Sequence, residues 1–294
     1  MNLIDYIVYT YVFIDDLFKK FTSTFKLRQR GFAPKLSDSE VITMEIVGEY
    51  LGHTTDKAIY QYFKRHWLHF FPTMPHRSNF VRQSANLWHV KQCFFKYLIE
   101  YKDTWIQMID SMPVEVCKFV RAKGTKLFKE SANFGKWCGQ TFFGYRLHLK
   151  INSFGMIHNF IVAPASHNDL KFTESLLEND RGGWVIADKG YRSQPLHDRL
   201  WQERHLYFHT SLRCNEKKVS PLPHQTICKL TGIRRLIETV AGQLEEQFSI
   251  KNTKARDLWH LMNRITRKIL SHTFGVYTNL NLNRNPLNLK SLIV

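Results

Sequence analysis

Two aspartates and one glutamate stand where a folded chain could bring their carboxylates together. Asp110 ends one short apolar run and Asp188 ends another, while Glu238 lies on a later amphipathic segment. Carboxylates held close together repel each other and raise one another's pKa, and a divalent cation removes that cost. The pattern therefore favours a metal site built from three elements.

Mg²⁺ prefers oxygen ligands and retains waters, so carboxylates plus phosphate oxygens are its usual partners in phosphoryl transfer. Two such ions roughly 3.5–4 Å apart would clamp the attacking and leaving oxygens of an in-line displacement. We therefore expect Asp110, Asp188 and Glu238 to hold two Mg²⁺ ions, with Mn²⁺ as a substitute.

Each carboxylate also has an ordinary interpretation. Asp110, followed by Ser-Met-Pro, could cap a turn at the end of its strand. Asp188 precedes Gly190 by two residues, and a turn that needs a positive φ explains that pair. A lone glutamate such as Glu238 is usually solvated. The joint placement on three elements is what favours the metal site.

The elements around the three acids predict one fold class. The alternation of apolar and polar residues from Tyr145 to Ile151 is typical of a half-buried strand. The element order is three antiparallel strands, then helix, strand, helix, strand and helix. This is the order of a ribonuclease H-like α/β domain, a mixed sheet flanked by helices. In that sheet the first and fourth strands are parallel neighbours. The predicted elements are strands 104–109, 140–151, 156–163, 184–187 and 206–210, and helices 170–177, 194–203 and 233–248.

The domain prediction has three parts. Residues 1–100 form an all-α region that opens one helix with the capping box Ser37-Asp38-Ser39-Glu40. It is either a helix-turn-helix-like DNA-binding region or a small bundle with a solvated basic face. Residues 101–252 form the catalytic domain. Residues 253–294 form a C-terminal basic helix and an asparagine-rich tail, expected to be extended or partly disordered.

The charge balance favours a polyanionic partner. Lys and Arg number 42 against 25 Asp and Glu among 294 residues, a formal net charge of +17. Nucleic acid is the commonest such partner, and an acidic membrane is the alternative. Residues 3–18 are strongly apolar, but they include three aspartates, and no basic residue precedes them. This segment therefore predicts neither a signal peptide nor a membrane span. We expect a cytoplasmic protein.

The five cysteines do not indicate a structural framework. They are scattered, odd in number and without a C-x-x-C pair, which disfavours disulfides. A zinc site at His209, Cys214, His224 and Cys228 is an alternative whose spacing matches no standard site.

Three blocks of the chain resemble the DDE transposases of bacterial insertion sequences. They are MIDSMPVEV around Asp110, VIADKGYRS around Asp188 and RRLIETVAGQLEEQF around Glu238, and the Asp-x-Gly-Tyr of the second is the most specific. FFGYRLHLKI and APASHNDLKFTESLL are also similar to segments of that family. The resemblance spans most of residues 104–250, and the short interval between Asp188 and Glu238 is that of a compact member.

The last block bears on the choice of the third acid. A related group carries Tyr-x-x-Arg-x-x-x-Glu followed by a Lys seven residues later. Arg234 and Glu238 match that pattern, whereas Thr231 stands at the Tyr place and Glu245 at the Lys place. The match favours Glu238 and leaves Glu245 as a rival. Arg234 could orient the carboxylate, bind phosphate or form a simple i,i+4 ion pair.

The resemblance implies a transposase. Such an enzyme binds the terminal inverted repeats of its element, cleaves the DNA at the element ends and joins the 3′-hydroxyl to target DNA, acting as a homodimer or larger assembly at the nucleoid. A nuclease without strand transfer and an inactive DNA-binding relic are the alternatives. Residues that could touch DNA, with solvated charge as the ordinary explanation, are Lys189, Tyr191, Arg192, Arg234, Arg264 and Arg267.

Overall fold

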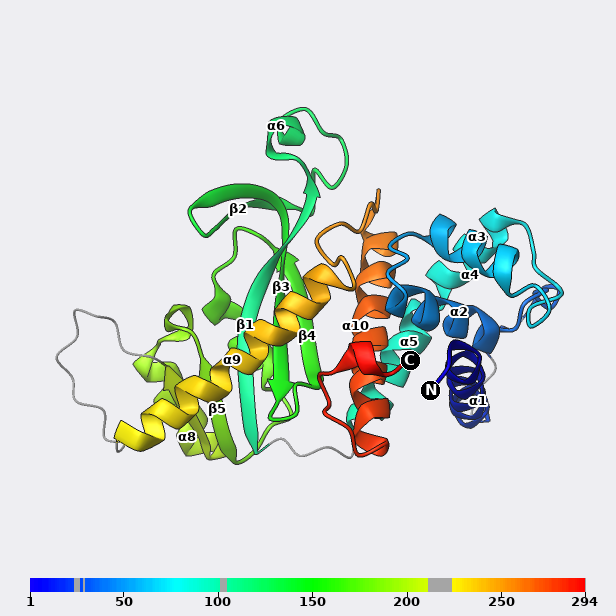
Figure 1. The fold of residues 1–294 in the computed structure, drawn as a ribbon. Helices are drawn as coiled ribbons and strands as arrows, with labels where there is room; N and C mark the ends of the chain where they lie inside the picture. The colour runs from blue at the N-terminus through cyan, green and yellow to red at the C-terminus, as the bar shows by residue number, and fades with distance from the viewer. Residues whose placement is uncertain (24–26, 29, 101–104, 211–223, 294) are drawn as a thin grey trace. The chain divides into compact units, whose positions relative to one another are not determined.

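The structure, a computed structural model, describes residues 1–23, 27–28, 30–100, 105–210 and 224–293, with side chains described except at 224–228 and 231. The chain divides into two compact units (Figure 1). Unit 1 comprises Met1–Leu98 and Leu244–Val294, and unit 2 comprises Ile99–Gln243. The domain boundaries that the sequence suggests, after residues 100 and 252, stay a prediction. In the structure the C-terminal helix packs with the N-terminal helices of unit 1.

Unit 1 is all-helical. The predicted capping box begins its second helix, where the Ser37 hydroxyl accepts a hydrogen bond from the Glu40 backbone N–H and the Glu40 carboxylate accepts one from Ser37. Nearly every residue of this helix is buried, since the first helix and the last both pack against it. The helices are α1 (Leu3–Thr22), α2 (Asp38–Tyr50), α3 (Asp56–His66), α4 (Arg77–Asn86), α5 (Trp88–Ile99) and α10 (Leu258–Asn281), with a 3₁₀ turn η3 (Leu289–Ser291).

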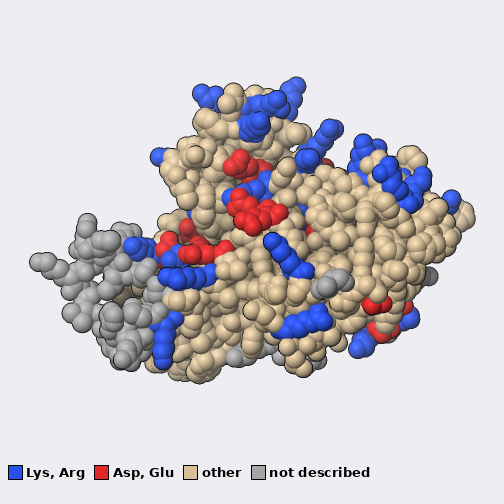
Figure 2. Space-filling model, in the orientation of Figure 1, with Lys and Arg blue, Asp and Glu red and all other residues tan. Residues whose placement is uncertain are grey.

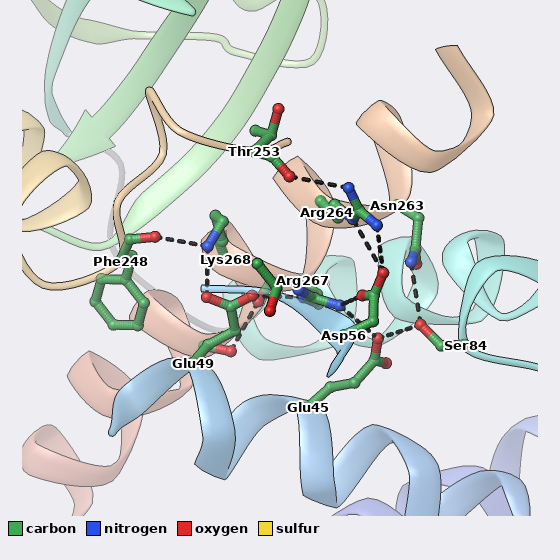
Figure 3. Close-up of polar contacts among 12 residues, drawn as sticks. Glu45, Glu49, Asp56, Ser84, Phe248, Thr253, Asn263, Arg264, Arg267 and Lys268 are labelled. Carbon is green, nitrogen blue, oxygen red and sulfur yellow. Dashed lines mark hydrogen bonds and ion pairs between the residues drawn. The ribbon is translucent and has the colours of Figure 1, made fainter. Parts of the chain in front are cut away.

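A buried ion network ties α10 to α2 and α3 (Figure 3). Arg267 is fully buried and pairs with Glu45, Glu49 and Asp56. Lys268, also fully buried, lies 2.6 Å from Glu49 and donates to the Phe248 carbonyl at the same distance. A buried charge is tolerated only when it is paired and hydrogen-bonded. The interpretation of Arg267 as a DNA contact is therefore wrong, because its guanidinium is enclosed by carboxylates.

The asparagine-rich tail is not extended as the sequence predicts. Helix α10 continues through its first residues to Asn281, and Leu289 and Leu292 beyond it are buried. The Tyr50 hydroxyl donates a hydrogen bond to the Leu289 carbonyl, and the Met1 ammonium donates one to the Leu292 carbonyl at 3.0 Å. Both leucines supply the apolar burial that fixes the tail to unit 1.

Unit 2 is built on a six-stranded mixed sheet, which confirms the predicted fold class. The strands run in the order β2-β3-β1-β5-β6, and β4 pairs with β3 beside β2. β1, β3 and β4 are antiparallel, whereas β1, β5 and β6 are parallel. The elements are β1 (Ile106–Cys117), α6 (Phe119–Ala122), β2 (Asn133–Trp137), β3 (Gln140–Asn152), β4 (Ile157–Pro164), η1 (Asp169–Phe172), α7 (Thr173–Leu176), β5 (Gly183–Ala187), η2 (Lys189–Tyr191), α8 (Gln194–Arg204), β6 (Leu206–Thr210) and α9 (His224–Glu246).

Two features of the sheet differ from the sequence prediction. Strand β1 does not end at Asp110 but continues to Cys117, because β3 pairs with it along its whole length. The short strand β2 was not predicted; it forms a hairpin with β3 through Cys138 and Gly139, both at positive φ. Its pattern is too short and too polar to indicate a strand from sequence.

One hydrophobic core lies between the parallel strands and the helices that connect them. Ile109 of β1 and Val185 of β5 pack there with Leu176, Leu200 and Leu206. Helix α9 runs across the sheet in front of β1 and β5 (Figure 1). In the described part of the chain, no helix is both long enough and apolar enough to cross a membrane.

Candidate active site

The site lies where β1 and β5 stop pairing. Their parallel register ends at the pair Ile109 and Ala187, so the next residues are Asp110, still within β1, and Asp188, directly after β5. The sheet thus brings the two predicted aspartates side by side, although β1 continues past Asp110.

The Asp188 carboxylate does not cap the turn that follows it. Asp188 precedes the 3₁₀ turn η2, but its side chain makes no capping hydrogen bond there. Its oxygen lies instead 3.4 Å from the Arg234 guanidinium of α9. Gly190 does not have the positive φ expected from the sequence, because the chain enters a 3₁₀ turn rather than a left-handed one. The ordinary explanation of Asp188 and Gly190 as a turn pair therefore does not hold.

Arg234 joins two of the three predicted acids. Besides Asp188, its guanidinium lies 3.8 Å from the Glu238 carboxylate, one helical turn along α9. Figure 2 shows Asp and Glu side chains gathered over the face that α9 crosses, with Lys and Arg among them. The side chain of Arg234 is 25% exposed and that of Glu238 is 59% exposed, so both can be reached from solvent. A simple i,i+4 pair does not describe Arg234, because it also binds a carboxylate from the sheet.

Asp110 is the most enclosed of the three acids. Burial raises its pKa to about 6. The Ser111 backbone N–H, which donates to the Asp110 carboxylate at 2.8 Å, and the Arg234 guanidinium lower it, whereas the carboxylates of Asp188 and Asp169 raise it. Asp110 therefore interacts electrostatically with both Arg234 and Asp188. A cation placed near it would relieve a real cost of ionisation.

A fourth acid, Asp169, lies beside this group. Both of its oxygens accept from Arg146 of β3 at 3.3 Å, and His148 Nδ1 lies 3.6 Å away. Burial lowers the pKa of His148 to about 4, so His148 is neutral at pH 7 and Arg146 supplies the positive charge. A pocket of about 460 Å³ adjoins Arg146 and Asp169. The signal for Asp169 was in the sequence, since the APASHNDLKF segment resembles the same family, but no role was predicted for it.

The donor set suits a hard divalent cation. Asp110, Asp188 and Glu238 offer only oxygen atoms, which Mg²⁺ and Mn²⁺ prefer and which do not select zinc. No group of three acidic, histidine or cysteine side chains is already arranged to hold an ion among the described residues; Arg234 pairs with two of the acids instead. The enclosed carboxyl of Asp110, with its raised pKa, is the observation that fits a cation.

The other predicted site residues have different positions in the structure. Tyr191 is 1% exposed and belongs to the core cluster, so the interpretation of Tyr191 as a DNA contact is wrong. Lys189 and Arg192 are half-buried beside Asp188. Glu245, the rival third acid, lies 2.5 Å from Lys251 rather than beside Arg234. Of the zinc alternative, Cys214 and the side chains of His224 and Cys228 lie outside the described residues.

Comparison with known proteins agrees with this geometry. A search of curated proteins and a search of solved structures each gave no match. The family model described as "Transposase DDE domain" matches residues 100–258, more than half of the chain and all three candidate acids. Together with the mixed sheet that places Asp110 beside Asp188, this match shows that the chain belongs to the family of transposase DDE domains.

Proposed function

We propose that this transposase binds the terminal inverted repeats of its mobile element, cleaves the DNA at the element ends and joins the freed 3′-hydroxyl to target DNA. Both steps would take place at Asp110, Asp188 and Glu238, and no covalent protein–DNA intermediate is needed. Two DNA ends must be brought together, so the active form would be a homodimer or larger assembly on DNA, at the nucleoid in the cytoplasm.

The strongest support for this proposal is the position of Arg234. A single guanidinium, that of Arg234, lies within 3.8 Å of carboxylates from two different elements, Asp188 and Glu238, and lowers the pKa of a third, Asp110. Three acids distant in sequence therefore each interact with the same guanidinium. A solvated helix glutamate and two turn aspartates would not share a partner.

The residues have distinct roles in the proposal. Asp110 would be ionised above pH 6 and, being enclosed, would hold its oxygens in a fixed position. Asp188 and Glu238 are more exposed and would approach the DNA. Two Mg²⁺ ions bound by these three acids, or Mn²⁺ in their place, would supply activation of the attacking water or 3′-hydroxyl and neutralisation of the leaving oxygen. Arg234 would hold the carboxylates in position and would contact phosphate through the N–H donors of its planar guanidinium.

Lys189 and Arg192 complete the proposed DNA contacts of unit 2. Lys189 follows Asp188 directly and Arg192 stands four residues after it, and both keep part of their side chains accessible to solvent. Phosphate contacts of this kind position a duplex without reading its sequence.

A joining assay tests the proposal. Purified full-length protein is incubated in Mg²⁺ with a labelled duplex that ends in a pre-cleaved element terminus and with a supercoiled target plasmid. The proposal predicts labelled plasmid whose junctions join the 3′-end of the element to target DNA. Cleavage of uncut ends without any joining would favour a nuclease that only hydrolyses, and DNA binding with neither reaction would favour an inactive relic.

A further inference from the structure

Unit 1 contains an open pocket of about 800 Å³ that is separate from the acidic site of unit 2. Its lining comes from α4, from the N-terminal parts of α3 and α10, and from Thr55 and Lys254 just before those two helices, all within unit 1.

The rim of this pocket is strongly basic. Lys57, Arg77, Arg82 and Lys254 line it, and all four are exposed. None of the four pairs with a carboxylate among the described residues. Arg82 donates a hydrogen bond to the side chain of Asn79, at 3.2 Å. Figure 2 shows Lys and Arg side chains gathered over α3 and α4. Four exposed cations around one hollow would repel each other unless an anion lay between them.

The one carboxylate among the lining residues does not oppose an anion. Asp56 is 4% exposed and pairs with both Arg264 and Arg267 (Figure 3). Arg264 is also held by the Thr253 carbonyl at 2.9 Å, so it closes the floor rather than reaching outward. The carboxylate at the floor of the pocket is thus neutralised by these arginines, and the residues of the rim keep their positive charge.

An aromatic surface lies beside the cations. Trp259 lines the pocket with 48% of its surface exposed, and its ring packs against Trp88 with the centroids 5.3 Å apart. An exposed tryptophan next to unpaired cations offers apolar contact for a sugar and charge for the phosphates on either side of it.

We infer that this pocket binds the sugar–phosphate backbone of double-stranded DNA. The inference rests on the proposed function, since it assigns to unit 1 a second place where the same DNA is held. Lys57, Arg77 and Lys254 would neutralise phosphates, Trp259 would pack on deoxyribose, and the contact would fix the position of unit 1 without reading base sequence.

The salt dependence of DNA affinity tests the inference in the full-length protein. The pocket variant combines Lys57→Ala, Arg77→Ala and Lys254→Ala. The control variant, with the same change in net charge, combines Lys35→Ala, Lys96→Ala and Lys290→Ala, three exposed lysines that do not line the pocket. Because each phosphate contact contributes about 0.9 to the slope of log K against log salt concentration, the pocket variant should lower that slope by about 2 to 3 and the control by less than about 1. Circular dichroism checks that both variants are folded.

Each outcome decides one question. Equal slopes in the two variants would overturn the inference, because DNA affinity would then depend only on net charge. If the pocket variant lost affinity for single-stranded DNA alone, the assignment to a duplex would be wrong. If wild-type protein cleaves element ends while the pocket and control variants bind DNA alike, the pocket inference fails and the proposed function stands. If wild-type protein neither binds nor cleaves DNA, the proposed function itself fails.

Discussion

The guanidinium of Arg234 lies 3.4 Å from the carboxylate of Asp188, directly after β5, although the two residues are 46 positions apart in the chain (234 − 188). This pair links helix α9 to the sheet edge where Asp110 also lies. The arginine thus offsets the mutual repulsion of acids that the fold brings together.

Replacing Arg234 should move the pH dependence of DNA cleavage. The Arg234 guanidinium lowers the pKa of Asp110, so Arg234→Met should raise that pKa above about 6. The acidic limb of the pH–rate profile should then shift to higher pH. Arg234→Lys keeps the charge and should restore most of the limb. The measurement is single-turnover cleavage from pH 5 to 9. An unchanged limb in Arg234→Met would mean that the arginine does not influence the acid that limits the rate.

Replacing Asp110 by its neutral isostere should stabilise the metal-free protein. Asp110 has a folded-state pKa of about 6 against an ordinary 3.8, so ionising it in the folded state has a cost. The free energy of unfolding of the wild type should therefore be unaffected by this cost below pH 4, and it should fall as the pH rises through 6. Asp110→Asn removes this loss and should gain about 1–3 kcal/mol at pH 7.5.

Urea unfolding in EDTA at pH 4 and pH 7.5 measures the effect. Asp188→Asn, at an exposed carboxylate, serves as the matched control and should change stability little. If Asp110→Asn destabilises the protein equally at both pH values, the carboxyl has a packing role and not the electrostatic cost described here.

The sequence predicted most of the fold because the strands follow apolar patterns. Alternation along β3 and the apolar run of β5 led to the sheet order and hence to the neighbouring positions of Asp110 and Asp188. The length of β1 could not be predicted, since its continuation past Asp110 depends on pairing with β3 far along the chain. The role of Arg234 stayed open for the same reason. Its i,i+4 spacing identifies Glu238 as a partner, but nothing in the sequence shows that Asp188 is a partner too.

Divalent metal should stabilise unit 2 in a pH-dependent way. Metal ions bind the ionised carboxylates, so Mg²⁺ should compete with the proton on Asp110. At pH 8, 10 mM Mg²⁺ should raise the midpoint of thermal unfolding by about 5 °C, and at pH 5 by much less. Differential scanning calorimetry with Mg²⁺ and with EDTA measures both shifts.

The carboxamide variants of the three acids control for metal bound elsewhere. Asp110→Asn, Asp188→Asn and Glu238→Gln should each remove most of the shift at pH 8. A shift of the same size in all three variants would show that the ion binds somewhere else in the protein.

Removing the central cation of the buried network should strongly destabilise unit 1. Arg267→Met would leave Glu45, Glu49 and Asp56 without their shared partner, and breaking a buried pair typically costs about 3–5 kcal/mol. Arg256→Met, at an exposed arginine just before α10, should change stability by less than about 0.5 kcal/mol. Denaturant unfolding followed by far-UV circular dichroism compares the two. A stable Arg267→Met protein with weakened DNA binding would instead show that this guanidinium reaches DNA.

The network also shows where sequence patterns fail. Arg264, Arg267 and Lys268 on one helix look like a basic face for DNA, because the spacing of charges does not show whether carboxylates lie opposite. Their partners come from α2 and α3, about 200 residues earlier in the chain, and only tertiary structure brings them together. Glu45 and Glu49 lie on helix α2, of which nearly every residue is buried in the structure.

The most direct test of the central claim is cleavage of an element-end duplex in Mg²⁺ by wild type and by matched carboxamide variants. We predict that wild type cleaves, that Asp110→Asn, Asp188→Asn and Glu238→Gln each lower the rate by about 10³-fold or more, and that double variants are no worse than single ones, because the acids act as a unit. Glu245→Gln, on the same helix, should cleave at close to the wild-type rate. Cleavage retained by Glu238→Gln but lost by Glu245→Gln would contradict the third acid, and cleavage retained by Asp188→Asn would contradict the site itself.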